Sequence, residues 1–169
     1  MKVLGIDPGL TGALALYWPT VSIECGLRWQ IIDTPTKDDV SELDARELMT
    51  WVQRFTPEIA VIERARAMPS FGKGDRRAMG STGAFRYGGI YHSVIAVLEC
   101  CGVKVVRVEP ASWKKYFGLK GSDKEQSRSA ALKLFPEAGS YLQRKKDQNR
   151  AEAILIASYG FHRATLVKS

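Results

Sequence analysis

Residues 3–12 read VLGIDPGLTG, an apolar run that stops at an acid and is followed by a turn. The run predicts a strand over residues 2–7 that ends on Asp7, and the following Pro-Gly pair predicts a tight turn. Thr11–Tyr17 and Ser22–Asp33 predict two further strands. Three strands joined by short turns form an antiparallel meander.

Helix and strand signals alternate after the meander. Ser41-Glu42-Leu43-Asp44 resembles a helix start, with Ser41 as the cap and an acid three residues later. The next apolar residues recur with the spacing of one helical face, and they are Leu48, Trp51, Val52 and Phe55. Glu58–Glu63 predicts a short buried strand that again ends on an acid. Residues 64–81 are rich in Gly, Arg and Lys and predict a loop.

The second half of the chain continues this alternation. It predicts a helix over Thr82–Cys101, a strand over Val103–Val108, a helix that begins at Ser122, and a final helix over Ala151–Tyr159. The predicted order is β-β-β-α-β-α-β-α-α, and strands separated by helices favour parallel pairing. We therefore expect one α/β domain over residues 1–169, with a mixed five-stranded sheet (an antiparallel meander plus parallel strands) flanked by helices.

Composition and charge limit the possible partners. The net charge is +7, but residues 1–63 hold five Lys/Arg against ten Asp/Glu, whereas residues 64–150 hold eighteen against seven. A basic half of this kind is what binding to a polyanion requires, because neutralised phosphates release their counterions. A solvated basic surface without a partner is an equally good interpretation of charge alone.

Several other classes of protein are disfavoured. No apolar run approaches the length of a membrane span, and residues 1–20 lack the basic start and cleavage site of a signal peptide. The three cysteines lack metal-ligand spacing, which favours reduced thiols. These features predict a cytoplasmic protein that does not act at a membrane.

Acidic residues occupy informative positions. Asp7 and Glu63 each end an apolar strand, Glu152 lies at the start of an apolar helix, and Asp147 precedes it by five residues. Acids from such segments can converge at one sheet edge, where carboxylate oxygens suit Mg²⁺ or Mn²⁺. Two such ions can promote phosphodiester hydrolysis. Taken singly, each acid could instead be a turn former, a helix cap or an exposed loop residue.

Three segments in order resemble the RuvC-type Holliday-junction resolvases, especially the compact bacterial and phage relatives. Residues 3–12 are similar to the first motif of that family, and the strand end at Glu63 is similar to the second. Residues 147–153, DQNRAEA, resemble the third motif, in which the last acid precedes an apolar helix. Residues 83–89 and 110–115 lie where family members carry comparable segments. The resemblance covers nearly the whole chain.

The resemblance implies a ribonuclease H-like fold, a homodimer and paired Mg²⁺-dependent nicks in opposed strands of a four-way DNA junction, with two ions per active site and Mn²⁺ as a substitute. By position, Asp7, Glu63 and Glu152 carry over as catalytic metal ligands. Family members place an acid or histidine three residues before the last ligand, and this chain has Asn149 there. We expect Asp147 to supply the missing carboxylate, with Asn149 as the alternative.

In the same frame, the basic residues are expected to bind DNA phosphates. The proposed contacts are Arg64, Arg66, Lys73, Arg76, Arg77, Arg86, Lys114, Lys115, Lys120, Lys124 and Arg128. Met68 and Phe71 are candidate wedges between unstacked bases, although Phe71 could equally anchor its loop on the core. His92 and His162 are interpreted as ordinary core or surface histidines.

Two other functions remain open at this stage. One is a non-catalytic junction-binding protein that keeps the fold and the basic face. The other is an ATPase of the actin-like class, which shares a Gly-Ile-Asp-x-Gly motif but needs a second domain and a second phosphate loop. We expect a bacterial protein, or a phage protein that acts in the bacterial cytoplasm. Finally, Thr82–Cys101 is expected to contribute to a dimer interface through surplus apolar residues, namely Ile90, Val94, Ile95 and Val97.

Overall fold

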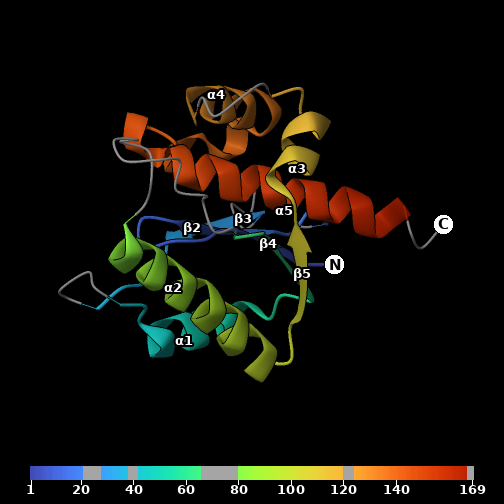
Figure 1. Ribbon diagram of the computed structural model, residues 1–169. Coiled ribbons are helices and arrows are strands. Elements are labelled where there is room, and N and C mark those ends of the chain that lie inside the picture. The colour runs from blue at the N-terminus through green and yellow to red at the C-terminus, as the bar shows by residue number, and fades with distance from the viewer. Residues whose placement is uncertain (21–27, 38–41, 66–79, 120–123, 167–169) are drawn as a thin grey trace.

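A five-stranded mixed sheet flanked by helices forms the molecule, which confirms the predicted fold class (Figure 1). The computed structural model describes residues 1–20, 28–37, 42–65, 80–119 and 124–166. The strands are β1 (Val3–Asp7), β2 (Ala13–Tyr17), β3 (Trp29–Asp33), β4 (Ile59–Glu63) and β5 (Lys104–Val108). The helices are α1 (Ala45–Phe55), α2 (Ser81–Cys100), α3 (Pro110–Tyr116), α4 (Lys124–Leu134) and α5 (Gln148–Leu166), with short 3-10 turns η2 (Pro136–Tyr141) and η3 (Lys145–Asp147).

The sheet order is β3-β2-β1-β4-β5, with β1 at its centre. β1 pairs antiparallel with β2, and β2 pairs antiparallel with β3, as the meander predicts. On the other side, β1 pairs parallel with β4 and β4 pairs parallel with β5. The carboxyl ends of β1, β4 and β5 therefore lie at one edge of the sheet.

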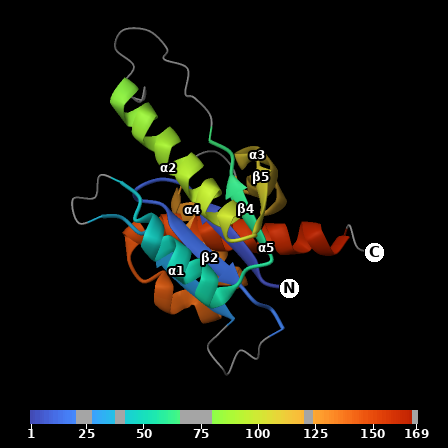
Figure 2. The same cartoon turned by 90° about the horizontal axis from the view of Figure 1, so that it is seen from below.

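Helices cover both faces of the sheet. α5 crosses one face, with α3 and α4 packed over it, and α1 and α2 cover the opposite face (Figure 1). Viewed from below, the N-terminal end of α2 reaches beyond the strands (Figure 2). Successive side chains of a strand point to opposite faces of the sheet. Alternate residues of a strand therefore belong to two different apolar clusters, one on each face. In β1, Val3 packs on the α5 side, whereas Leu4 and Ile6 pack on the α1 and α2 side.

The face under α5 is built from small residues. A Cβ atom on Gly5 would lie 2.2 Å from the carbonyl oxygen of Ala153 and 2.3 Å from the backbone nitrogen of Ala157. A Cβ atom on Gly160 would lie 2.4 Å from Cγ2 of Val61. These two glycines allow the backbone of α5 to lie directly against β1 and β4, which fixes where the first turns of α5 meet the sheet edge.

The structure corrects the predictions for three helices. Ser41 lies outside the described residues, and α1 begins only at Ala45, with Asp44 Oδ1 accepting a hydrogen bond from the backbone N–H of Glu47 at 2.9 Å. Leu43 forms an isolated bridge with Thr36, so the chain is still extended there. α3 was not predicted as a helix, and α5 is longer than Ala151–Tyr159 at both ends.

The proposed dimer residues of α2 have a different role from the one expected. Ile90, Val94 and Ile95 are buried within one chain, packed with α1 and the sheet, so they are not surplus apolar surface. Val97 is partly buried against the same cluster.

No helix in the described ranges is long and apolar enough to cross a membrane.

Candidate active site

Asp7 and Glu63 lie at the same sheet edge because their strands are parallel neighbours. Asp7 follows Ile6 and Glu63 follows Ile62, and these two isoleucines are partners in the β1–β4 register. Both acids are half-buried. The apolar residues before them anchor each strand in the core, so each carboxylate is the first polar group at the rim.

Glu152 joins this edge from α5. It is only 4% exposed, and it follows Ala151 and precedes Ala153, whose carbonyl oxygen lies against Gly5 of β1. The hydroxyl of Ser127 in α4 donates a hydrogen bond to Glu152 Oε1 at 3.2 Å. The ammonium of Lys114 in α3 lies 3.6 Å from the same oxygen. Glu152 is therefore a buried acid held by residues from two other helices.

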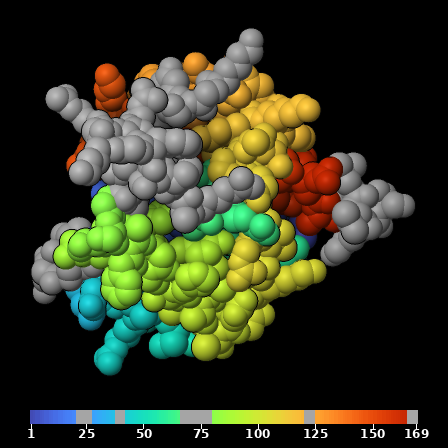
Figure 3. Space-filling view, viewed as in Figure 1, coloured from blue at the N-terminus to red at the C-terminus, as the bar shows by residue number. Residues whose placement is uncertain are grey.

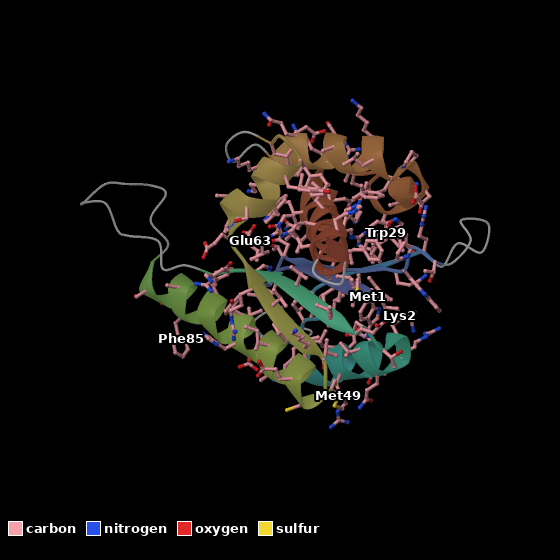
Figure 4. All side chains as sticks on the ribbon, turned by 90° about the vertical axis from the view of Figure 1, so that its right-hand side faces the viewer. Met1, Lys2, Trp29, Met49, Glu63 and Phe85 are labelled. Atoms are coloured by element: carbon pink, nitrogen blue, oxygen red, sulfur yellow. The ribbon has the colours of Figure 1, made fainter. Side chains whose placement is uncertain are left out.

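α3 also reaches Glu63. The indole Nε1–H of Trp113 donates a hydrogen bond to Glu63 Oε2 at 2.7 Å, and the Trp113 side chain is fully buried. Figure 4 shows Glu63 at the end of its strand, close to α3. The sequence does not single out Trp113, because its hydrogen bond to Glu63 depends on α3, a helix that the sequence pattern does not predict.

Tyr87 of α2 is a further residue at this edge that the sequence did not reveal. Burial, together with the nearby negative charges of Asp7 and Glu63, raises the pKa of the Tyr87 phenol to about 12. Its ring also lies beside the turn after β1, since a Cβ atom on Gly9 would lie 3.7 Å from Tyr87 Cε2. Gly9 has a φ of +142°, a conformation that favours glycine.

The two candidates for a fourth ligand lie in different surroundings. Both carboxylate oxygens of Asp147 accept hydrogen bonds from Arg144, at 2.7 Å from Nη2 and 2.8 Å from the backbone nitrogen. Burial raises the pKa of Asp147, but hydrogen bonds and charge from Arg144, aided by Arg150, outweigh it and lower that pKa. The side chain of Asn149 donates to the backbone carbonyl of Thr11, in the turn that follows Asp7.

The three motif acids suit a hard divalent cation in kind. Their donors are carboxylate oxygens, the type that Mg²⁺ and Mn²⁺ prefer. Among the described residues, however, no group of three or more His, Cys, Asp or Glu side chains is placed to hold a metal ion. The cationic neighbour of Glu152 is Lys114. The site thus has suitable oxygen donors at one edge of the sheet, but the described side chains do not already form a complete set of metal ligands.

Some of the predicted DNA contacts that the structure describes are paired within the protein, and others are exposed. Arg64 pairs with Glu109 at 3.3 Å, and Arg128 donates to the carbonyl of Leu142 and to Glu125, each at 2.9 Å, so both have partners within the protein. Lys115 is exposed on α3 beside Lys114. A small patch from the end of β4 and the residues just after it lies at the surface between α2 and α3 (Figure 3).

Arg86 lies on a separate groove of about 570 Å³ between α1 and α2, to which Phe85 and Glu42 also contribute. The lining of this groove does not include Asp7, Glu63 or Glu152. The remaining predicted DNA contacts and both wedge candidates lie outside the described residues, and they are Arg66, Met68, Phe71, Lys73, Arg76, Arg77 and Lys120. Lys124 begins α4, but its side chain is outside the description.

Comparisons with solved structures identify the fold. No protein-family model and no curated protein matches the sequence. Thermus thermophilus RuvC matches with a TM-score of 0.61 and 21% identity over 98% of this chain and 96% of that chain. The same RuvC in complex with a Holliday junction substrate matches with a TM-score of 0.60 over the same shares, at 21% identity.

The fowlpox virus Holliday junction resolvase matches with a TM-score of 0.54 and 13% identity, over 97% of this chain and 99% of that chain. Nearly the whole of this chain is therefore aligned with nearly the whole of each of these proteins. The five-stranded mixed sheet and its flanking helices are the ribonuclease H-like fold of the Holliday junction resolvases.

Proposed function

We propose that this protein is a Mg²⁺-dependent endodeoxyribonuclease that resolves four-way DNA junctions by paired nicks. The observation that carries the proposal is the placement of Asp7, Glu63 and Glu152. Two of these acids end neighbouring parallel strands, and the third lies on the helix that packs directly on β1. They occupy this edge in a fold shared with Holliday junction resolvases.

The chemistry follows from the kind of ligand. Asp7, Glu63 and Glu152 would hold one or two Mg²⁺ ions, with Asp147 or Asn149 as the proposed fourth ligand. When bound, such ions supply an activated water and stabilise the leaving oxygen of a phosphodiester. The protein keeps Glu63 and Glu152 in place through Trp113 and Ser127. Lys114, beside Glu152, is placed to neutralise a DNA phosphate that approaches this edge.

Binding to DNA is proposed to be mainly electrostatic. Residues 64–150, with eighteen Lys/Arg against seven Asp/Glu, include Lys114 and Lys115 on α3, which adjoins the acid edge. Arg64 and Arg128 take part in contacts within the protein, so we assign them a weaker share of DNA binding. The proposed partner is a four-way or otherwise branched DNA in a bacterial or phage-infected cytoplasm.

Two symmetric nicks require two active sites at a fixed separation, and an isologous homodimer provides them. We therefore propose a two-fold symmetric dimer. Among the described residues of α2, Phe85 has the large apolar side chain that is most exposed, at 83% (Figure 4). This residue replaces the buried Ile90, Val94 and Ile95 as the apolar group that α2 can offer to a partner.

The deciding experiment is a nicking assay on a synthetic four-way junction with each strand labelled in turn. We expect Mg²⁺-dependent nicks at symmetric positions in two opposed strands, no nicks with EDTA, and little cleavage of a linear duplex of the same sequence. Glu63→Gln should bind the junction and fail to nick it.

One alternative has an observation in its favour. The ion pair between Lys114 and Glu152 would suit a non-catalytic junction-binding protein, since the lysine already neutralises the acid. Tight junction binding with no nicking at any Mg²⁺ or Mn²⁺ concentration would establish that alternative and exclude the nuclease. Neither binding nor nicking would exclude both.

A further inference from the structure

Two acids of the candidate site are each held by an uncharged donor. Trp113 Nε1 donates to Glu63 Oε2 at 2.7 Å, and Ser127 Oγ donates to Glu152 Oε1 at 3.2 Å. Trp113 is fully buried and Ser127 is 2% exposed. The donors come from α3 and α4, whereas the acids come from β4 and α5. Each contact therefore joins segments that are far apart in the sequence.

The chemical type of these donors matters. An N–H or O–H group without charge fixes the direction of a carboxylate oxygen and does not itself neutralise the acid. At Glu152 the neutralising group is a separate residue, Lys114, whose ammonium lies 3.6 Å from the same oxygen. Asp147 shows the opposite arrangement in the same protein, because Arg144 both orients that carboxylate and neutralises it. Outer residues that orient ligands in this way raise metal affinity, and their loss typically lowers affinity or activity by about 10–100-fold.

Trp113 has a second contact at the site. The ammonium of Lys114 lies 5.1 Å from the centre of the Trp113 ring and 3.6 Å from Glu152 Oε1. A cation over an indole face is attracted to it. Trp113 therefore contacts Glu63 directly and also helps to place the lysine beside Glu152.

We propose that Trp113 is a positioning residue for Glu63, and that Ser127 has the same role for Glu152, so that α3 and α4 set the affinity of the site for divalent cations. This inference rests on the proposed function, because it takes both acids as metal ligands. Neither residue touches the metal or the DNA in this proposal, and each acts through its carboxylate.

The first test measures Mn²⁺ binding to the DNA-free protein by calorimetry, with electron paramagnetic resonance of free Mn²⁺ as a second method. Trp113→Phe keeps an aromatic ring and removes the N–H, and Ser127→Ala removes the hydroxyl. We expect Trp113→Phe to weaken Mn²⁺ binding by about tenfold. We expect Ser127→Ala to weaken it by a smaller factor, because its hydrogen bond is longer.

The chain offers matched controls. Trp29 is 2% exposed and donates its indole N–H to Glu137 Oε1 at 3.3 Å, and Figure 4 shows it well apart from Glu63. Trp29→Phe therefore removes a similar hydrogen bond outside the site. Ser158 of α5 is 1% exposed and its Oγ makes no hydrogen bond within the described residues, so Ser158→Ala is the control for loss of a buried hydroxyl without loss of a hydrogen bond. Both controls should leave Mn²⁺ affinity within about twofold of wild type, at whatever cost in thermal stability.

A second measurement does not depend on any variant of Trp113 folding well. The four tryptophans give four indole N–H signals in a ¹⁵N spectrum of the full chain. Glu63→Gln and added Mg²⁺ should each move one signal strongly, the same one in both cases, and that signal should be missing from Trp113→Phe. If Trp113→Phe does not fold, replacement of Trp18, Trp29 and Trp51 in turn assigns the signal by exclusion.

The outcomes separate the inference from the function beneath it. Wild type that neither binds Mn²⁺ nor nicks a junction defeats the proposed function. Wild type that binds Mn²⁺, with an indole signal that ignores both Mg²⁺ and Glu63→Gln, defeats only the inference. Unchanged Mn²⁺ affinity in folded Trp113→Phe also defeats it. Equal losses of Mn²⁺ affinity in Trp113→Phe and Trp29→Phe would show that Trp113 acts only through packing.

Discussion

Gly5 of β1 and Ala153 of α5 are in direct backbone contact, since a Cβ atom on Gly5 would lie 2.2 Å from the Ala153 carbonyl oxygen. Ala153 directly follows Glu152, so this contact sets how close that acid lies to the end of β1. The short distance between α5 and the sheet therefore determines where Glu152 lies in the candidate site. A glycine in the first motif is required here by a close approach and not by an unusual backbone angle.

We predict that Gly5→Ala destabilises the protein by about 3 kcal/mol or more, because backbone atoms cannot move aside as a side chain can. Urea unfolding followed by circular dichroism measures this free energy. Gly88→Ala is the matched control, since a Cβ atom there meets nothing within 4 Å. It lies inside α2 and should stabilise the protein by up to about 1 kcal/mol. Equal stability of Gly5→Ala and wild type would contradict the contact.

The sequence allowed much of the fold to be predicted, for a physical reason. β1 and β4 are each a short apolar run that ends on an acid, so both could be placed from local pattern alone. α3 could not, because Pro110–Tyr116 is a short helix whose principal contact, Trp113 to Glu63, joins residues fifty positions apart.

The site residues, too, could be predicted from the sequence only where local pattern places them. Asp7 and Glu63 were predicted from strand ends, because parallel neighbours bring their ends to one edge. Tyr87 was missed, because its place beside Gly9 depends on how α2 packs and not on its neighbours in the sequence. The partners of Asp147 were missed as well. Arg144 and Asp147 are three residues apart in a charged run that resembled an exposed loop, yet Asp147 is 4% exposed.

Catalysis and binding should separate at Asp7. Asp7→Asn removes the charge of a proposed metal ligand and changes none of the basic residues, so it should abolish nicking while junction affinity stays within about tenfold. A strand-labelled nicking assay and a gel-shift titration, run on the same preparation, give the two numbers. Turnover equal to wild type would remove Asp7 from the active site. Loss of binding together with nicking would indicate a folding defect, which circular dichroism checks.

Junction binding should depend steeply on salt. If the protein contacts 6–10 phosphates, the affinity should fall by roughly 10³–10⁵ between 50 and 200 mM salt. Fluorescence anisotropy with a labelled junction measures the slope. Neutral substitutions at Arg76 and Arg77 should make it shallower, whereas substitution of Arg128, which donates to Leu142 and Glu125, should change it less. A slope near zero would mean that the basic half does not bind DNA.

The protein should be a dimer of about twice 18.8 kDa by light scattering at micromolar concentration. Phe85→Ser should weaken the dimer, because that side chain is the most exposed large apolar group among the described residues. Leu134→Ser, which changes an apolar residue of α4 that is 49% exposed, is the control. A monomer with and without junction DNA would exclude the dimer, and a Phe85→Ser protein as dimeric as the control would exclude α2 as its interface at that residue.

Substitutions at Asp147 and Asn149 can identify which of the two is the proposed fourth metal ligand. We predict that Asp147→Asn severely weakens nicking across a Mg²⁺ titration and that Asn149→Ala has a mild effect, because a carboxylate contributes charge as well as an oxygen. Since Arg144 holds Asp147, this substitution also tests a structural role. The Asp147 pKa is lowered in the folded protein, so its contribution to stability is present above the ordinary aspartate pKa of about 3.9 and is lost as the pH falls through the lowered value.

Unfolding free energy therefore separates the two roles of Asp147. Asp147→Asn should cost about 1–3 kcal/mol at pH 7, and the difference from wild type should shrink below about pH 4. Asp33→Asn, which removes the carboxylate that Arg150 binds at 2.6 Å, is the control for loss of an arginine partner. If Asp147→Asn loses stability like the control but keeps wild-type Mn²⁺ affinity, Asp147 is structural. A large loss of Mn²⁺ affinity in Asn149→Ala would then place Asn149 on the metal.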